Sequence, residues 1–227
     1  MSTSNFEAIT FTAYPEQTAD FTADARVNDR EMQAEEPFRS RIYHAGNFHV
    51  PQDMLDQVEQ ECAALPESVS LTFHTGKQYW ASDSHWLSPF LKGFLEASET
   101  RFREFVQAST GAAHKDLICA VQAGPYRFRE DNDWHRDSSD PYGRQYLATL
   151  FGPTTEFSLD TYTTAQFDSG DLVHVGGVDL RSIYPSPHHH ITLHAEGTTV
   201  HRAPPESYTN VNRLFYHCLF AKRANYK

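Results

Sequence analysis

Residues 190–220 read HITLHAEGTTVHRAPPESYTNVNRLFYHCLF, and this stretch contains three short runs of residues that favour β-strands. The runs are His190–His194, Thr198–His201 and Arg213–Phe220, and prolines interrupt the chain between the last two. β-Branched and aromatic residues favour strands, whereas proline pairs end them. Similar runs precede this stretch at Leu117–Val121, Gln145–Phe151 and Asp171–Val175. The C-terminal half is therefore predicted to consist of short strands.

Two helices are predicted before these strands. Pro51–Leu65 has apolar residues at helical spacing and is followed by Pro66, which cannot continue a helix. In the second helix Ser88 can act as the N-cap, Pro89 suits the first helical position, and Gly111 ends the apolar stripe. Helices followed by many short strands indicate an α+β domain. Its sheet part is expected to be a jelly roll, that is, a double-stranded β-helix or cupin-like barrel with flanking N-terminal helices.

Length and composition set the domain organisation. A chain of 227 residues is long enough for one domain with a sizeable core and one site. Residues 1–40 are rich in Thr, Ala, Asp and Glu, and are expected to form a loosely packed N-terminal arm with at most one strand, at Phe6–Ala13. Residues 41–227 are expected to form a single jelly-roll domain.

Charge and apolar content limit the partners. The formal net charge of -11 opposes attraction to a phosphate backbone, so a nucleic-acid substrate is disfavoured. No stretch approaches the roughly 20 apolar residues that a membrane span needs, and the sequence does not begin like a secretion signal. We therefore expect a cytoplasmic protein without membrane contact. The cysteines, Cys62, Cys119 and Cys218, are far apart in sequence and are expected to be buried free thiols.

Residues 134–137, WHRD, contain a His-x-Asp pair, which directs an imidazole and a carboxylate to the same side of a strand. The tripeptide alone is a weak signal, because the composition predicts about one such pair by chance. A second pair, His114-Lys115-Asp116, closely follows the end of a predicted helix, where a capping or surface role is the ordinary explanation. His135 and Asp137 are therefore the better candidates for metal ligands.

A third ligand has to come from elsewhere in the fold, because a 2-His-1-carboxylate triad leaves three positions of an iron ion open. His201 ends a predicted strand and precedes a rigid Pro-Pro exit, and His194 is the alternative. If the chain reverses direction near Ser207, Arg213 lies opposite His201. The planar guanidinium of arginine binds a carboxylate in bidentate fashion, so this arrangement suits a dicarboxylate that also chelates the metal.

The order His135-x-Asp137, His201, Arg213 resembles the H-x-D…H…R pattern of the Fe(II)/2-oxoglutarate-dependent dioxygenase superfamily, over roughly Gln122 to Lys222. The residues around these motifs also resemble a bacterial subgroup of that superfamily. The resemblance implies that His135, Asp137 and His201 bind Fe(II) and are the catalytic residues, and that Arg213 binds the cosubstrate 2-oxoglutarate. It implies consumption of O2, release of succinate and CO2, and hydroxylation of a small molecule, an amino acid or a peptide. Because Asp137 is present, oxygenation is favoured over halogenation.

One position departs from the pattern of the superfamily. Many members have a serine or another small polar residue two positions after the arginine, and this chain has Phe215. Thr149 or Tyr146 is then expected to supply the missing hydroxyl group, and we assign Thr149 to cosubstrate binding.

Two other functions stay open at this point. A cupin-type metal enzyme would keep the histidine site without using 2-oxoglutarate, and Arg213 would be an incidental strand residue. A non-catalytic jelly-roll binding module would make the histidines coincidental. The consecutive residues His188, His189 and His190 are assigned to an exposed loop, because neighbouring strand residues point to opposite faces and cannot all reach one ion.

Overall fold

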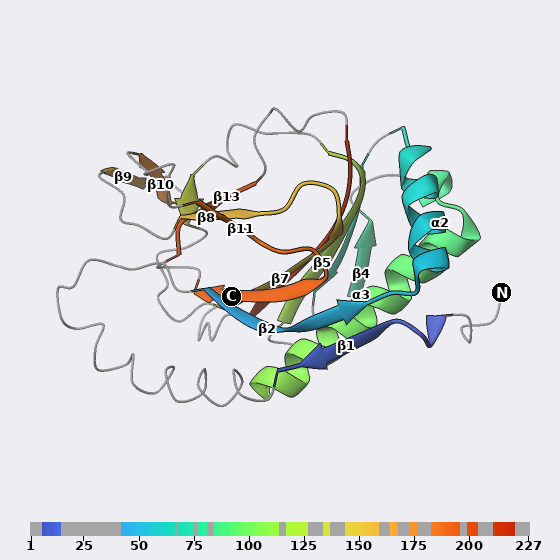
Figure 1. Ribbon diagram of the computed structural model, residues 1–227, viewed down its shortest axis with the longest axis horizontal. Coiled ribbons are helices and arrows are strands. Elements are labelled where there is room, and N and C mark those ends of the chain that lie inside the picture. Colours follow the sequence, from blue (N-terminus) through green and yellow to red (C-terminus); the bar gives the residue numbers. More distant parts are fainter. Residues whose placement is uncertain are drawn as a thin grey trace.

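Figure 1 shows the computed structural model of the chain. The predictions for Asp137, for residues 114–116, for residues 15–40 of the N-terminal arm and for the chain reversal near Ser207 lie outside the residues that it describes. The described residues are 6–14, 42–66, 68–74, 77–80, 84–113, 117–126, 134–136, 144–158, 164–167, 173–176, 183–195, 199–203 and 211–220.

Both predicted helices are confirmed. α2 spans Gln52–Ala63 and α3 spans Pro89–Thr110. The Ser88 hydroxyl accepts a hydrogen bond of 2.9 Å from the Leu91 N–H, which caps the start of α3. Gly111 adopts a φ of +67°, a left-handed conformation that favours glycine, and ends α3. The capping residues therefore set both ends of the longer helix.

The strands of the described residues form two antiparallel sheets, and a short 3-10 turn, η2 (Ser84–Trp86), precedes α3. The main sheet has the order β1-β2-β12-β7-β14-β5-β3-β4, with bounds Thr10–Ala13, Ile42–His49, His190–Ala195, Arg144–Phe151, Asn212–Phe220, Leu117–Pro125, Val69–His74 and Lys77–Trp80. The minor sheet has the order β11-β8-β13-β6-β10-β9, with bounds Ile183–Pro185, Glu156–Ser158, His201–Arg202, His135–Arg136, Val173–Gly176 and Thr164–Phe167. The helices lie on one side of the main sheet, and the minor sheet lies on the other (Figure 1).

The chain alternates between the two sheets. From β5 to β8 each successive strand joins the other sheet, and from β12 to β14 it does so again. Within these two runs, strands that follow one another in sequence therefore lie in different sheets and do not pair as hairpins. Two antiparallel sheets with two helices among the described residues confirm the predicted α+β class.

The hydrophobic core lies between the main sheet and the two helices. Its members include Phe94 and Phe102 of α3 and Leu71, Val121 and Tyr216 of the sheet. β12 shows the two faces of the sheet, because Ile191 and Leu193 belong to the core and the alternate residues Thr192 and His194 do not. We call the face that carries Thr192 and His194 the inner face. It is polar at these positions although both side chains are buried.

Residues 6–14, within the predicted N-terminal arm, pack against the main sheet and α3. β1 pairs with β2 at the edge of the main sheet, which confirms a strand in this region at Thr10–Ala13. Phe6 and Ile9 are buried, and the Arg101 side chain of α3 donates hydrogen bonds to the carbonyls of Glu7 and Ile9. Phe6 and Ile9 thus join residues 6–14 to the hydrophobic core. The domain boundary itself stays a prediction.

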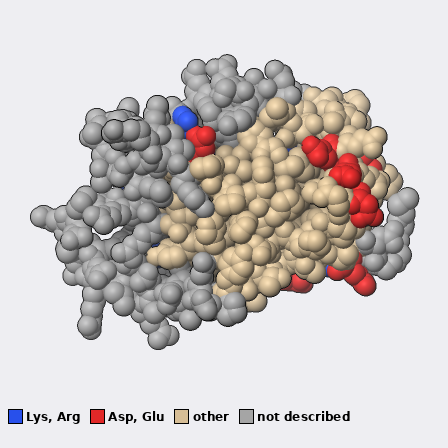
Figure 2. All heavy atoms as spheres, in the orientation of Figure 1, with Lys and Arg blue, Asp and Glu red and all other residues tan. Residues whose placement is uncertain are grey.

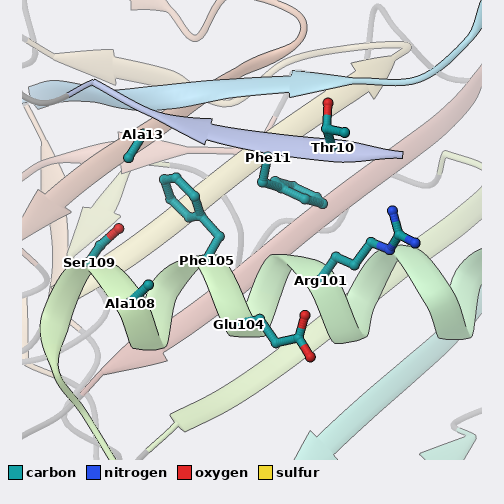
Figure 3. A pocket seen from close by; sticks show the side chains of 8 residues that line it. All are labelled: Thr10, Phe11, Ala13, Arg101, Glu104, Phe105, Ala108 and Ser109. Atoms are coloured by element: carbon teal, nitrogen blue, oxygen red, sulfur yellow. The ribbon is translucent and has the colours of Figure 1, made fainter. Parts of the chain in front are cut away.

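A groove of about 700 Å³ lies between β1 and α3 (Figure 3). It is lined by Thr10, Phe11, Ala13, Arg101, Glu104, Phe105, Ala108 and Ser109. The groove belongs to the helix side of the main sheet, so it is separate from the inner face.

The surface of α2 is acidic. Its charged residues are Asp53, Asp56, Glu59 and Glu61, and Asp and Glu side chains gather over this helix in Figure 2. A helix surface of this kind does not attract a phosphate backbone. Within the described residues, no helix combines the length and the apolar character that a membrane crossing requires.

Two of the three cysteines form a disulfide, so the prediction of three free thiols is wrong for this pair. Cys119 on β5 and Cys218 on β14 lie opposite each other in the register, with Cα atoms 4.0 Å apart. Cys62 on α2 is free and buried. The bonded residues are 99 positions apart in sequence, so the pairing depends on which strands become neighbours. Sequence spacing does not carry that information.

Glu99 of α3 is a carboxyl group inside the core. Its side chain is 0% exposed, and neither oxygen has a hydrogen-bond partner among the described residues. Arg103 Nη2 lies 3.5 Å from Glu99 Oε2. Burial raises the pKa of Glu99 to about 8, while Arg103 opposes this rise and Glu104 adds to it. Glu99 is therefore mostly protonated and neutral in the folded protein at pH 7.

We expect Glu99→Gln to stabilise the protein at neutral pH. The folded state holds the proton up to about pH 8, whereas an unperturbed carboxyl loses it near pH 4.5, so the free energy of unfolding falls as the pH rises between these values. Glutamine resembles the neutral acid and removes this loss, which is roughly 3 kcal/mol at pH 7. Urea unfolding at pH 5 and pH 7 measures the difference. Glu59→Gln, at an exposed position of α2, is the control, and a Glu99→Gln protein with the wild-type pH slope contradicts the prediction.

Candidate metal and carboxylate site

Two of the predicted metal ligands lie side by side in the minor sheet. His135 begins β6 and His201 begins β13, and the register places them directly opposite each other. Their ring centres are 4.6 Å apart, and each residue is 6% exposed. Two imidazoles that bind one metal ion at about 2.1 Å in neighbouring positions have ring centres roughly 4.5 Å apart. The spacing of His135 and His201 therefore fits a shared metal ion.

One ring nitrogen of His201 lies close to a backbone carbonyl. Its Nδ1 atom lies 3.3 Å from the Thr199 carbonyl oxygen. A histidine that binds a metal commonly donates its other ring N–H to a backbone carbonyl, which fixes the tautomer and the ring orientation. With a proton on Nδ1, Nε2 carries the lone pair that a metal ion would accept.

The third predicted ligand, Asp137, lies outside the described residues, one position beyond the end of β6. Among the described residues, no group of three His, Cys, Asp or Glu side chains is placed to hold a metal ion. The register of β10 and β6 also sets His174 opposite His135. A complete triad of the predicted kind therefore needs a residue beyond the described ones, and Asp137 stays the prediction.

Arg213 is a buried cation that lacks a carboxylate partner among the described residues. It lies near the start of β14, is 4% exposed, and donates one hydrogen bond of 3.2 Å from Nη2 to the Thr155 hydroxyl. Its Nε has no hydrogen-bond partner within the described part of the chain. The guanidinium carbon lies 4.1 Å from the centre of the Phe215 ring and 5.5 Å from that of Tyr126. These aromatic faces stabilise the charge, but they leave N–H groups for an anion.

Burial lowers the pKa of Arg213 to about 10, and the nearby Tyr126 opposes this change. The side chain still carries its charge at neutral pH. A buried charge without a counterion is costly, and an anionic ligand that binds there removes much of that cost. The surroundings of Arg213 therefore favour a carboxylate or another small anion.

The sheet partners of Arg213 differ from those predicted. Arg213 pairs with Gly124 in the main sheet, whereas His201 pairs with His135 and Phe157 in the minor sheet. The predicted hairpin that sets Arg213 opposite His201 is therefore wrong. The physical reason is the alternation of the chain, because β13 and β14 belong to different sheets.

β8 and the residue before it connect the two halves of the site. Thr155 contacts Arg213, and Phe157 pairs with His201, with ring centres 6.0 Å apart. Residues two positions apart in an extended segment lie on one face, about 7 Å from each other. Arg213 contacts this segment at Thr155, and His201 pairs with it at Phe157. The histidine pair and Arg213 are therefore neighbours, although they do not share a hairpin.

The hydroxyl group beside Arg213 comes from Thr155, a residue that the sequence did not single out. Thr149 is 1% exposed, and the register places it next to Phe215 on β14. Tyr146 faces the helices instead, since its ring packs against Phe105 with centres 6.4 Å apart. Tyr146 therefore cannot supply the hydroxyl. Thr155 and Arg213 are 58 positions apart in the sequence, so the spacing of residues does not predict their contact.

Gly152 allows the close approach that places Arg213. It has a φ of +83°, and a Cβ at this position would overlap the carbonyl oxygen of Asn212 and lie 2.8 Å from the Cα of Arg213. Both the conformation and the contact require glycine. The end of β7 is thereby packed directly against the start of β14.

We expect Gly152→Ala to lower the free energy of unfolding by more than the roughly 1–3 kcal/mol of backbone strain alone, because the new methyl group also collides with β14. Gly111→Ala is the matched control. Gly111 has a similar positive φ, but a Cβ there meets nothing within 4 Å. Urea unfolding of the two variants separates strain from collision. Equal losses would contradict the close approach of Gly152 to β14.

Trp134 and Arg202 form an outer group on the opposite side of the minor sheet. Arg202 Nε lies 2.7 Å from Glu156 Oε2, and the guanidinium carbon is 4.5 Å from the centre of the Trp134 ring. Each of these residues is next to His135, His201 or Phe157 in sequence, so its side chain points to the other face. Arg202 is therefore engaged away from the histidine pair.

The histidine tract does not converge on one point. The His188 ring hydrogen-bonds the Gly152 carbonyl at 2.7 Å, while the His190 ring lies 5.4 Å from that of His44. The predicted exposed loop holds for His188, but His190 begins β12. The alternative ligand His194 is at the site, because it is 0% exposed and its ring centre is 4.8 Å from that of His201.

The sequence matches no protein-family model, and no curated protein matches it. Solved structures with similarity to the chain include a prolyl-4-hydroxylase of Pseudomonas putida, with 14% identity, 96% of this chain and 94% of that chain covered, and a TM-score of 0.31. EvdO2 of Micromonospora carbonacea in complex with 2-oxoglutarate has 15% identity and a TM-score of 0.39, and the match covers 98% of this chain and 92% of that chain.

A dioxygenase for auxin oxidation from Arabidopsis thaliana, in complex with 2-oxoglutarate, has 10% identity, 87% and 88% coverage and a TM-score of 0.34. The last two of these structures contain 2-oxoglutarate, the cosubstrate that the sequence pattern implies. Identities and TM-scores at this level are too low to transfer chemistry. The assignment of a function has to rest on the residues of this chain.

Proposed function

We propose that the protein is a non-haem Fe(II)/2-oxoglutarate-dependent oxygenase. The observation that carries this proposal is the buried guanidinium of Arg213, which has no carboxylate partner among the described residues and lies beside a segment that also contacts the histidine pair. A metal ion alone needs no such cation. A ligand with one chelating end and one carboxylate end needs both groups, and 2-oxoglutarate has that form.

The proposed architecture is a double-stranded β-helix, in which the two sheets are the halves of one jelly roll. The order β5-β14-β7-β12 in the main sheet and β8-β13-β6-β10 in the minor sheet supports it, because successive strands alternate between the halves. Such a fold directs residues from both sheets into the space between them. The histidine pair comes from one half and Arg213 from the other.

His135, Asp137 and His201 are the proposed ligands of Fe(II). When bound, the metal and 2-oxoglutarate would supply the oxidising chemistry, with consumption of O2 and release of succinate and CO2. The Nδ1 contact of His201 with the Thr199 carbonyl supports its role, since it directs Nε2 away from the backbone.

Arg213 is proposed to bind the distal carboxylate of 2-oxoglutarate, and Thr155 to hold the guanidinium in place. Thr149, on β7 of the main sheet, is also proposed to contact the cosubstrate. Phe215 and Tyr126 flank the guanidinium and exclude water, which strengthens its attraction for a carboxylate. The aromatic ring of Phe215 thus has a function of its own in the place where many relatives of the resembled superfamily have a small polar residue.

The proposed reaction is hydroxylation of a small molecule, an amino acid or a peptide. Orientation of the substrate and exclusion of water are the contributions of the protein. Release of succinate that depends on a candidate substrate would identify the substrate class.

We expect Arg213→Met to raise the dissociation constant of 2-oxoglutarate by at least roughly 30-fold, because removal of one partner from a buried charged pair costs about 2 kcal/mol or more. Anaerobic addition of 2-oxoglutarate to the Fe(II)-loaded protein should produce a weak visible charge-transfer band whose titration gives this constant. Arg202→Met is the control, because Arg202 pairs with Glu156 on the outer side. An Arg213→Met protein that binds 2-oxoglutarate as tightly as the wild type would contradict the role of Arg213.

His201→Ala and Asp137→Ala are expected to abolish the band through loss of iron, which metal analysis measures directly. The same measurements separate the alternatives. An iron-loaded wild type without the band indicates a cupin-type metal enzyme that does not use 2-oxoglutarate. A wild type that takes up no metal under anaerobic, reducing conditions indicates a non-catalytic binding module.

A further inference from the structure

The ring of His201 is surrounded by three other rings. The centre of His135 lies at 4.6 Å, that of His194 at 4.8 Å and that of Phe157 at 6.0 Å. His135, His201 and Phe157 belong to the minor sheet, but His194 belongs to β12 of the main sheet. His194 also packs against Phe157, with centres 5.2 Å apart. The metal-ligand candidate is therefore held between the two sheets by ring contacts.

The backbones of His194 and Arg213 lie at different levels of the main sheet. The register sets His194 level with Gln145 of β7, which in turn is level with Leu219 of β14. Leu219 lies six residues beyond Arg213 along the strand. The ring of His194 packs against His201 and Phe157, so we look for its role at His201.

Among the described residues, His194 does not complete a three-ligand group with His135 and His201. Its ring lies close to that of His201, but His135, His194 and His201 do not form a group of three that could hold one ion, since the described residues contain no such group. What the structure offers is a fully buried ring packed against the side of a proposed ligand. Such contacts orient a metal-binding side chain and thereby change the affinity of the site for the metal.

We propose that His194 is a positioning residue for His201, a role that rests on the proposed function of the site. The last side-chain torsion of a histidine is broad, so contacts decide where the ring nitrogens point. The Thr199 carbonyl fixes one edge of the His201 ring, and the His194 ring blocks its rotation from the side of the main sheet. His194 thereby links the packing of the main sheet to the direction of His201 Nε2.

The test uses the metal affinity of the full-length protein. Metal-free protein is titrated with Co(II), and the visible spectrum reports both the dissociation constant and the ligand geometry. His194→Ala is expected to raise the dissociation constant by about 10–100-fold. His194→Phe keeps a ring at the same place and is expected to bind Co(II) nearly as well as the wild type. If His194→Ala does not fold, His194→Leu replaces it, because leucine fills the space without a flat ring.

His190→Phe is the matched control, since His190 lies on the same strand and packs against His44 instead of His201. Thermal unfolding of each metal-free variant shows whether a change in affinity is more than a change in stability. An unchanged dissociation constant in His194→Ala overturns the proposal, and so does an equal loss in His194→Phe, which would assign the effect to a ring nitrogen. A wild type that binds no Co(II) contradicts the proposed function itself, whereas failure of the His194 variants alone leaves that function intact.

Discussion

Among the described residues, helices cover one face of the main sheet, and the proposed site depends on this asymmetry. Phe94 and Phe102 of α3 pack with Tyr216 in the core, and the Ser98 hydroxyl of α3 shares a hydrogen bond of 2.9 Å with the Tyr216 hydroxyl. Leu214, Tyr216 and Cys218 of β14 thus belong to the core on the helix side. Its alternate residues, which include Arg213, are left for the inner face, where polar groups can be directed toward the minor sheet.

Burial of polar groups on the inner face has an energetic cost that the core has to offset. Arg213 is almost completely buried, yet within the described residues its only hydrogen-bonded side-chain partner is Thr155. A charge in such a place destabilises the folded protein unless a ligand completes its hydrogen bonds. Glu99 shows the other solution, because burial keeps that carboxyl group protonated at neutral pH. An arginine cannot be neutralised in this way, so the burial of Arg213 favours the anion-binding role that we propose for it.

The sequence predicted the parts of the structure whose signals are local. The Ser88 cap and the Gly111 stop define α3 through contacts within four residues, and the predicted strands agree with β5, β7, β12 and β14 because their alternation is long enough to be read. β6 and β13 have two residues each, too few for any periodic pattern. The sequence also did not predict contacts that depend on the order of the strands. These are the Cys119–Cys218 disulfide and the contact of Arg213 with Thr155. The proposed ligands His135 and His201 were selected for their chemistry and not for their secondary structure.

The two ends of the site differ in how firmly the backbone holds them. Arg213 lies on a nine-residue strand in the middle of the main sheet, paired on both sides by β5 and β7 and locked by the close approach of Gly152. The histidine pair lies on strands of two residues, which contribute few ladder hydrogen bonds. Segments with few such bonds open at lower free energy than central strands. The proposed anion-binding end is therefore rigid, whereas the geometry of the proposed metal end has to come from side-chain packing, and the rings around His201 provide that packing.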